Sequence, residues 1–509
     1  MKKIYLPVAL LMLSFTSVAQ ARYLDPSFGK DGYVITNFKD NASLNSLAIQ
    51  ADGKVIAAGT SNGNFAIARY NIDGSADNNF GTNGKVITDL GNDENARSVA
   101  IQTDGKIVVA GYTETGIYPN IQSKIVVVRY NTDGSLDNSF GNDGKVITTV
   151  EQQTFCYALA LQTDGKILVT GSTTTDGNET EILLVRYNTN GTPDNSFGTA
   201  GIVSTSYDFE NEAYTIALQP DGKILTGGFT YDGSSNSTNS IIARYLQNGT
   251  LDNSFGENGF AIDYAGVTSA LAIQADGKIL YAGHGYNDNY DFYGTLSRLN
   301  TNGTKDTSFN RYGVVAGGYY SGFTSNVYDV VVQADGKAVV SVSRTSGYPE
   351  YKKELGVIRF NADGKADLTF GNNGLISVLS DAVSYGNPTT NPLAITADSK
   401  ILSGATFKNN FAIARILTLN AVAFSNNQLK NTLIIHLYPN PVAASFMVNG
   451  LDKTLPAVIT ISDVAGNIMK VQKLVAGTTS VNVATLQQGR YVAVFTQNNK
   501  TGSVKFIKK

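Results

Sequence analysis

A seven-fold internal repeat is the feature of this 509-residue sequence that most constrains its fold. A turn of the type Asp-Gly-Lys recurs along the chain, beginning at Asp52 and ending with a weaker copy at Asp398-Ser399-Lys400. The spacing, roughly 50 to 65 residues, is that of a repeat protein in which each unit packs on its neighbours. An Arg before an apolar or aromatic residue recurs at Arg69, Arg129, Arg186, Arg244, Arg298, Arg359 and Arg415. An Asp three residues before a Phe recurs at Asp25, Asp77, Asp137, Asp194, Asp252, Asp306 and Asp367.

Each repeat contains four short apolar runs, which in the second repeat are Ser98–Gln102, Lys106–Ala110, Lys124–Tyr130 and Gly144–Val150. A two-residue Asp-Gly connection joins the first run to the second, which is a strong hairpin signal. The third run is almost entirely apolar, as expected for a strand covered on both faces. Helical periodicity is nowhere sustained. We therefore predict an all-β fold, a seven-bladed β-propeller with four-stranded blades over residues 22–418.

The two ends of the repeat region complement one another. The first repeat supplies only a fourth strand, Tyr33–Thr36, whereas the last supplies the first three strands, Leu393–Thr396, Lys400–Gly404 and Phe411–Ile416. We expect the N-terminal strand to complete the last blade, because ring closure leaves no open sheet edge.

The N-terminus has the pattern of an export signal. Lys2 and Lys3 precede an apolar run over Ile4–Phe15, and Ala19-Gln20-Ala21 is a small-residue cleavage site. We predict a signal peptide over residues 1–21. No later run approaches the ~18 apolar residues of a spanning helix, so no membrane span is expected. The formal net charge is -3, without a basic stripe that would indicate a nucleic-acid partner.

The repeat resembles the delta-60 repeat family. The matching residues are the Asp-Gly-Lys run followed by an apolar residue, together with Arg-Tyr-Asn-x-Asp-Gly-x-x-Asp-x-Ser-Phe-Gly, over roughly residues 22–418. Repeats five and seven depart from this pattern, since Leu299 follows Arg298 and Ser399 replaces Gly. The resemblance implies a propeller-like secreted protein and carries no established activity.

Four short motifs follow one another in the C-terminal part: Leu437–Pro441, Ile461–Gly466, Leu486–Tyr491 and Lys505–Lys508. In these residues and their order, this part resembles the type A sorting domain of proteins exported by type IX secretion. The resemblance covers roughly residues 430–509, and the change in composition suggests a linker over 419–432 and a domain over 433–509. It implies recognition by the secretion machinery, removal of the domain, and release or attachment at the cell surface. Short alternating runs such as Ala457–Ser462 predict a small β-sandwich. The sorting-signal residues are Tyr438, Pro439, Asn440, Pro441, Asp463, Gly466, Gly489, Tyr491, Lys505 and Lys508.

Motifs that might carry chemistry have simpler structural interpretations. Loops such as Asn71-x-Asp73 with Asp77 offer oxygen ligands, and calcium is an alternative, but turn backbones use the same residue types. An Arg present in every repeat favours a packing or hydrogen-bonding role. His284 lacks nearby His or Cys residues for a metal site, and Cys156 lacks a basic neighbour. We therefore expect no catalytic residue, no metal site and no cofactor.

Ligand binding is expected on the propeller face that carries the variable loops. In a four-stranded meander the repeated turns lie on one face and the variable loops on the other, where function usually resides. These loops are rich in Tyr, which suits recognition of a glycan or a surface protein. An equally simple interpretation is that these tyrosines pack the loops. The candidate ligand-binding residues are Tyr207, Tyr214, Tyr286, Tyr290, Tyr293, Tyr319 and Tyr320.

The leading function is a secreted or cell-surface, non-catalytic binding or adhesion protein. One alternative is a propeller-type polysaccharide lyase or hydrolase with a metal in the central channel. Only two histidines are present, which disfavours this alternative. A second alternative is a structural component of the surface layer. The sequence does not indicate an oligomeric state.

Overall fold

The computed structural model describes two compact units, Met1–Asn420 and Ala421–Lys509, which are treated separately below. The described residues are 23–509 except 40, 117–120, 152, 176–178, 234–236, 264–265, 287–291, 310–322, 347–352, 373, 381–390, 419–432, 434, 439, 464–466, 479 and 499. The predicted signal peptide lies outside them. No helix that could span a membrane is found in this described part of the chain.

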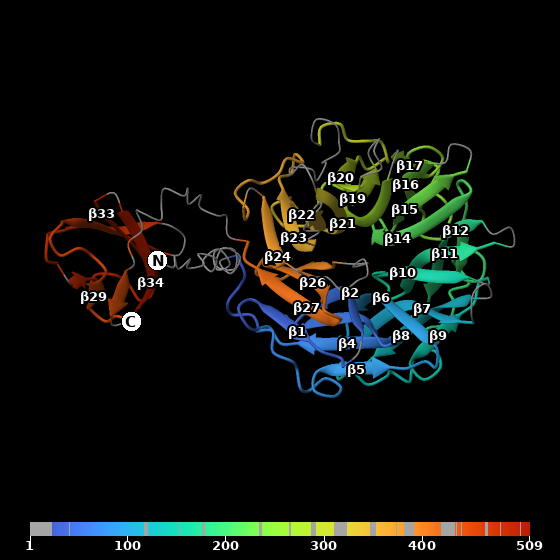
Figure 1. The fold of residues 1–509 in the computed structure, drawn as a ribbon, viewed down its shortest axis with the longest axis horizontal. Helices are drawn as coiled ribbons and strands as arrows, with labels where there is room; N and C mark the ends of the chain where they lie inside the picture. The colour runs from blue at the N-terminus through green and yellow to red at the C-terminus, as the bar shows by residue number, and fades with distance from the viewer. Residues whose placement is uncertain are drawn as a thin grey trace, which may run out of the picture. The chain divides into compact units, whose positions relative to one another are not determined.

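The first unit is built of antiparallel meanders arranged in a ring (Figure 1). The first three are β2 (Ala42–Ile49), β3 (Val55–Ser61), β4 (Asn64–Tyr70) and β5 (Lys85–Thr88); β6 (Asp93–Ile101), β7 (Ile107–Thr115), β8 (Gln122–Tyr130) and β9 (Lys145–Thr148); and β10 (Thr154–Leu161), β11 (Ile167–Thr174), β12 (Thr180–Tyr187) and β13 (Ile202–Thr205). The next three are β14 (Glu210–Leu218), β15 (Ile224–Asp232), β16 (Ser237–Tyr245) and β17 (Phe260–Asp263); β18 (Gly266–Ile273), β19 (Ile279–Tyr286) and β20 (Phe292–Leu299); and β21 (Phe323–Val332), β22 (Ala338–Ser346), β23 (Lys353–Phe360) and β24 (Leu375–Ser380).

The last meander joins the two ends of the repeat region. It consists of β25 (Leu393–Ile395), β26 (Ile401–Phe407), β27 (Asn410–Ile416) and the N-terminal strand β1 (Tyr33–Thr36). β1 pairs with β27 from Tyr33 opposite Ala414 to Thr36 opposite Phe411, so the predicted pairing of the N-terminal strand is confirmed.

The innermost strands form a continuous ring. Contacts run from β2 through β6, β10, β14, β18 and β21 to β25, which contacts β2 again. The predicted all-β propeller is thus confirmed. The count of seven complete blades stays a prediction, because the fourth strand expected after β20 falls within residues 310–322, outside the described part of the chain.

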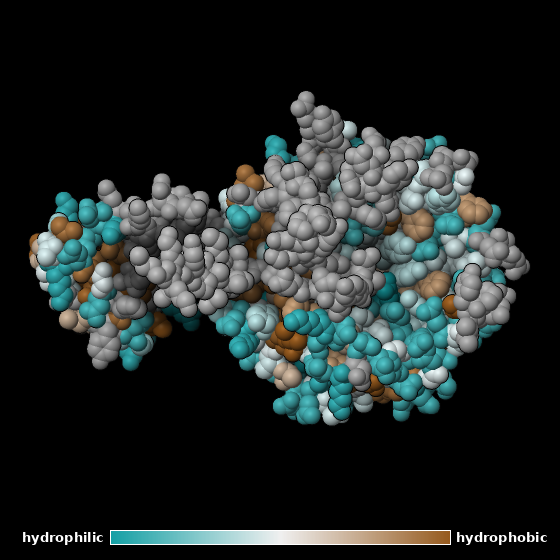
Figure 2. Space-filling model, viewed as in Figure 1, coloured by the Kyte–Doolittle hydropathy of each residue, from teal (hydrophilic) through white to brown (hydrophobic). Residues whose placement is uncertain are grey.

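The core lies between neighbouring meanders. Along β8, Val126 and Val128 pack with residues of the preceding meander, whereas Ile125 and Val127 pack with those of the following one. All four side chains are buried, so the near-continuous apolar run of this strand follows from its two covered faces. Figure 2 shows that the face over β4, β5, β8 and β9 is mainly hydrophilic, with scattered hydrophobic groups.

The repeated turn keeps its conformation where its sequence changes. Gly53 of the first turn has a φ of 83°, which is readily adopted only without a side chain. Ser399 occupies the same position in the last turn with a φ of 65°. The fold therefore imposes the left-handed conformation on Ser399 despite the cost for a residue with a Cβ.

The fifth repeat replaces one hydrogen bond of the pattern with another. In three other repeats the Tyr after the repeated Arg bonds a Thr of the preceding meander, as Tyr70 does with the hydroxyl of Thr36 at 2.6 Å. Leu299 cannot do so. Instead, the buried Tyr281 of β19 donates to Asp263 at 2.7 Å, and Asp263 also accepts from Lys305 at 3.0 Å. The contact between neighbouring meanders is thus kept through different residues.

The second unit consists of two antiparallel sheets around one core, as the sandwich prediction requires. One sheet contains β28 (His436–Tyr438), β29 (Ser445–Asn449) and β32 (Ser480–Asn482). The other contains β31 (Ile468–Leu474), β30 (Ala457–Asp463), β33 (Gly489–Gln497) and β34 (Lys500–Lys508). Both contribute to a single buried cluster that includes Phe446 of β29 and Phe495 of β33.

Candidate functional site

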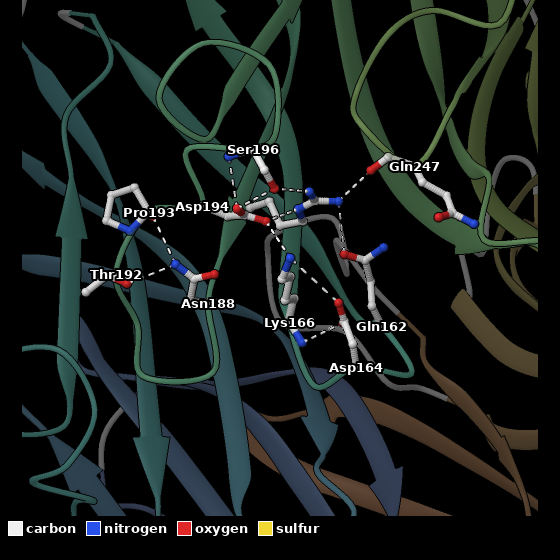
Figure 3. Close-up of polar contacts among 10 residues, drawn as sticks. Gln162, Asp164, Lys166, Asn188, Thr192, Pro193, Asp194, Ser196 and Gln247 are labelled. Carbon is white, nitrogen blue, oxygen red and sulfur yellow. Dashed lines mark hydrogen bonds and ion pairs between the residues drawn. The ribbon is translucent and has the colours of Figure 1, made fainter.

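The repeated Arg, Asp and Lys residues form one network in each repeat, shown for the third repeat in Figure 3. The Nε of Arg186 donates to Oδ2 of Asp194 at 2.7 Å, and Lys166 forms an ion pair with the same carboxylate at 3.0 Å. The guanidinium carbon of Arg186 also lies 4.4 Å from the ring centroid of Phe197. Asp194 is buried. The network therefore pairs a buried charge with two cations, as burial requires.

Each Arg also reaches the following repeat. Arg186 donates to the backbone carbonyl of Gln247 at 2.5 Å. The corresponding carbonyl acceptors for the other repeated arginines are Thr132 for Arg69, Thr189 for Arg129, Thr301 for Arg244, Ala362 for Arg298, Thr418 for Arg359 and Ile72 for Arg415. The repeated arginines thus hold neighbouring blades together, which agrees with the hydrogen-bonding role predicted for them from the sequence.

The carboxylates of the repeated loops are occupied by protein donors. Asp77 accepts from Arg69 and Lys54, and Asp73 accepts from the backbone and the hydroxyl of Ser75. Hollows on the turn face are lined by these already paired side chains, including Lys54 and Arg69. Among the described residues, no group of three or more His, Cys, Asp or Glu could hold a metal ion.

A β-bulge occurs at the same place in the innermost strands. The pairing of the first strand with the second shifts register around one residue in each of six meanders. Because a bulge redirects a side chain, this position can differ in chemistry from the rest of the scaffold. The residues at the bulge are Asn45, Arg97, Tyr157, Tyr214, Ser269 and Tyr328.

A glycine of the second strand makes room for each of the first five bulges. A Cβ added to Gly171 would lie 1.9 Å from the carbonyl oxygen of Phe155, a distance that no side chain can tolerate. The equivalent glycines Gly59, Gly111, Gly228 and Gly283 meet a carbonyl oxygen at 1.8 to 1.9 Å in the same way.

Three consecutive innermost strands bring together a cluster of aromatic side chains, which we call the axial cluster. Its members are Tyr112, Phe155, Tyr157, Tyr214 and Phe229 from β7, β10, β14 and β15, with Arg97 of β6 and Glu212 of β14. The Tyr157 ring meets the Tyr214 ring edge to face at 5.0 Å between centroids, and Tyr112 meets Phe155 likewise at 5.0 Å. All these side chains are partly exposed, so the cluster is accessible from outside the protein.

The axial cluster carries charge of both signs. The guanidinium carbon of Arg97 lies 5.5 Å from the centroid of the Tyr157 ring. Burial raises the pKa of Glu212, an effect that the hydroxyls of Tyr214 and Tyr157 partly offset by favouring the carboxylate. The neighbouring Cys156 is buried, and burial raises the pKa of its thiol to about 12. Aromatic rings, a cation and a carboxylate thus lie within one patch.

The structure places the predicted tyrosines differently from the sequence interpretation. Tyr214 was expected in a variable loop, but it belongs to the innermost strand β14, because β14 begins already at Glu210. Tyr286 ends β19 and Tyr293 lies in β20, so these two also belong to strands. Tyr207 lies in the loop before β14 and is 46% exposed, and its ring packs on the Phe260 ring with 4.9 Å between the ring centroids. Tyr290, Tyr319 and Tyr320 lie outside the described residues.

The sorting-signal residues gather around the ends of the second unit's strands. Asn440 accepts from the backbone of Ile507 at 2.9 Å, and Tyr491 donates to the carbonyl of Gln487 at 2.9 Å. The remaining members lie as follows: Tyr438 in β28, Pro441 just after it, Asp463 at the end of β30, Gly489 at the start of β33, and Lys505 and Lys508 in β34. Pro439 and Gly466 lie outside the described residues.

Sequence reasoning missed Arg97, Tyr157 and Glu212. The signal that could have found them is the recurrent glycine of the second strand, since Gly111 and Gly171 mark a bulge in the strand that pairs with each. The glycine recurs from repeat to repeat, whereas the residue at the bulge opposite it differs, as Arg97 and Tyr157 show.

Two families match the chain. Residues 50–80, 102–140, 162–197, 219–255, 274–309 and 333–370 match the family described as "Domain of unknown function (DUF5122) beta-propeller". Residues 436–509 match the family described as "Secretion system C-terminal sorting domain". No curated protein matches the chain.

Solved structures of low sequence identity align with most of the chain. Virginiamycin B lyase from Staphylococcus aureus is 11% identical, with 76% of this chain and 100% of that chain covered and a TM-score of 0.40. The β-propeller domain of the Trilobed protease from Pyrococcus furiosus is 12% identical, with 77% and 100% covered and a TM-score of 0.38. At these scores the likeness carries no argument about activity.

Proposed function

We propose a recognition function for this chain, which carries DUF5122 β-propeller repeats followed by a C-terminal sorting domain for type IX secretion. The sorting domain indicates export to the cell surface or release from the cell. The proposed role of the propeller there is to bind a glycan or a surface protein without catalysing a reaction.

The observation that carries this proposal is the axial cluster. Tyr and Phe side chains provide a broad, rigid contact surface, and Tyr hydroxyls add hydrogen bonds at low entropic cost. The cluster interrupts the regular pattern of the repeats, whereas the turn face uses its charges within the protein. Residues that differ between repeats on a conserved scaffold are where a repeat protein carries specificity.

The variable loops contribute at the margin of this site. Tyr207 and Phe209 are both exposed and precede β14, from which Glu212 and Tyr214 extend. The proposed binding site is therefore rich in Tyr, as the sequence predicts, but its centre lies on the innermost strands and the variable loops form its edge.

The test is a screen of the purified mature protein against glycans and surface proteins, using Tyr157→Ala and Tyr157→Phe. We expect a ligand whose binding falls at least about tenfold in the Ala variant, while the Phe variant, which keeps the ring, retains most affinity. Tyr207→Ala separates the two locations, because a loop-centred site would depend on it instead. Unchanged binding in Tyr157→Ala, with an intact melting transition, would refute a site at the cluster.

The non-catalytic part of the proposal has its own test. A bound polysaccharide incubated with the protein should yield neither new reducing ends nor the ultraviolet absorbance of an unsaturated product. Either signal, if abolished by a substitution in the axial cluster, would instead establish an enzyme.

A further inference from the structure

Arg97 of the axial cluster differs from the repeated arginines in having no polar partner among the residues that the structure describes. Its guanidinium lies over the Tyr157 ring, and within the described residues it forms neither a hydrogen bond nor an ion pair. Arg129 of the same meander, in contrast, bonds Asp137, the carbonyl of Thr189 and Ser139. The planar guanidinium of Arg97 therefore presents all its N–H donors to solvent or to a ligand.

The position of Arg97 directs this free cation toward the propeller axis. It is the residue at the bulge of β6, an innermost strand that contacts β2 and β10. The guanidinium lies over an aromatic ring of the next strand, and it is partly buried. A partly desolvated guanidinium held by a ring is suited to bidentate binding of a carboxylate.

Glu212 does not neutralise Arg97. No ion pair joins the two side chains among the described residues, and the groups that act on the Glu212 carboxylate are Tyr214, Tyr157 and Glu210. The charge of Arg97 instead acts on Tyr112, Tyr157, Tyr214 and Cys156, whose pKa values it lowers against the larger opposing effect of burial. The cluster thus keeps a cationic end at β6 and a hydrogen-bond acceptor at β14.

We propose that Arg97 is the anion-binding residue of this site and that the ligand is an acidic saccharide, a sugar ring bearing a carboxylate. This inference rests on the proposed recognition function and names its ligand class. The carboxylate binds the Arg97 guanidinium, the apolar face of the sugar packs on the Tyr157 and Tyr214 rings, and ring hydroxyls donate to Glu212. A sugar ring combines these three features, which match the cation, the rings and the acceptor of the axial cluster.

Isothermal titration with an acidic saccharide and its uncharged methyl ester tests the inference. The probes are a galacturonic acid trisaccharide and its methyl ester, titrated into the chain of residues 22–509, which retains the second unit, and into its Arg97→Gln variant. We expect the acid to bind at least about tenfold more tightly than the ester to the native protein, and Arg97→Gln to remove this difference. Arg490→Gln, which removes an exposed charge in the second unit, is the matched control and should keep the preference.

The outcomes separate this inference from the function on which it rests. Equal affinity for acid and ester, no binding of either, or a preference retained in Arg97→Gln would overturn the acidic-saccharide assignment. If another ligand still binds and depends on Tyr157, the recognition function survives that result. A Glu-rich peptide that binds through Arg97 more tightly than the trisaccharide would assign the site to an acidic peptide instead.

Discussion

At the scale of single residues, the repeated carboxylates hold the blades together, whereas Arg97, which is unpaired among the described residues, is the proposed anion-binding residue. Burial alone would raise the pKa of Asp194, but hydrogen bonds from Ser196 and Lys166 and the charge of Arg186 lower it below its usual value. The carboxylate is therefore more stable in the folded protein than in the unfolded chain. Among the described residues Arg97 shares no partner with this network, so we expect a substitution of Arg97 to leave the network intact.

Replacing one carboxylate of the network should be strongly destabilising. In Asp194→Asn the buried Arg186 loses its ionic partner, and we expect the free energy of unfolding to fall by about 3 kcal/mol. Asp164→Asn is the matched control: its side chain is 55% exposed and 3.7 Å from Lys166, so its loss should cost less than about 0.5 kcal/mol. Chemical denaturation of both variants measures the difference, and equal effects would contradict the structural role.

The same carboxylates predict how stability depends on pH. The pKa values of Asp25, Asp137, Asp194, Asp306 and their equivalents are lowered in the folded protein. A lowered folded pKa gives stability that is present above the unfolded value of 3.8 and is lost as pH falls through and below it. The melting temperature should therefore drop steeply below about pH 4, and less steeply in Asp194→Asn. A melting temperature that stays constant from neutral pH to about pH 3 would be inconsistent with this account.

At the scale of strands, much of the propeller could be predicted from the sequence and the bulges could not. Asp-Gly turns and the buried run of β8 are local signals, because turn geometry and burial each select particular residue types. The sequences of the bulged strands do not show the bulges at Arg97 and Tyr157, because their signal lies in the partner strand, at Gly111 and Gly171. The sequence interpretation places Tyr214 in a loop because the bulge of β14 at this residue interrupts the alternation of apolar and polar residues that identifies a strand.

The closing strand gives the clearest prediction at this scale. Deleting residues 22–37 removes β1, the ion pair between Asp25 and Arg415, and the buried Phe28. We expect the melting temperature of the propeller to fall by about 10 °C or more, because an open edge and an unpaired buried Arg remain. Ile35→Ser, at a position 43% exposed on the same strand, is the control and should melt almost as the native protein does. An unchanged melting temperature after the deletion would contradict ring closure by β1.

At the scale of the whole molecule, the chain combines a scaffold with an export signal. The sorting domain forms its own sandwich around a separate core, so its removal need not disturb the propeller. The family match of residues 436–509 could be anticipated from the order of its motifs, since each motif lies near a strand end. The ligand could not be anticipated, because the axial cluster is assembled from residues of three successive repeats, each of which contributes only part of it.

Truncation should uncouple folding from export. A chain that ends before Tyr438 lacks the sorting domain, and we expect it to remain in the periplasm with a propeller that still unfolds cooperatively. Cell fractionation with antibodies against the propeller measures this distribution. Normal surface display or release of the truncated chain would show that export does not depend on this domain.

Hydrogen–deuterium exchange with and without a bound ligand tests the central claim most directly, namely that the axial cluster is the recognition site. A ligand seated there should slow amide exchange in β6, β10 and β14, around Arg97, Tyr157 and Glu212, and leave the Asp-Gly-Lys turns unchanged. Protection confined to those turns or to the second unit, with no change in the innermost strands, would contradict the account.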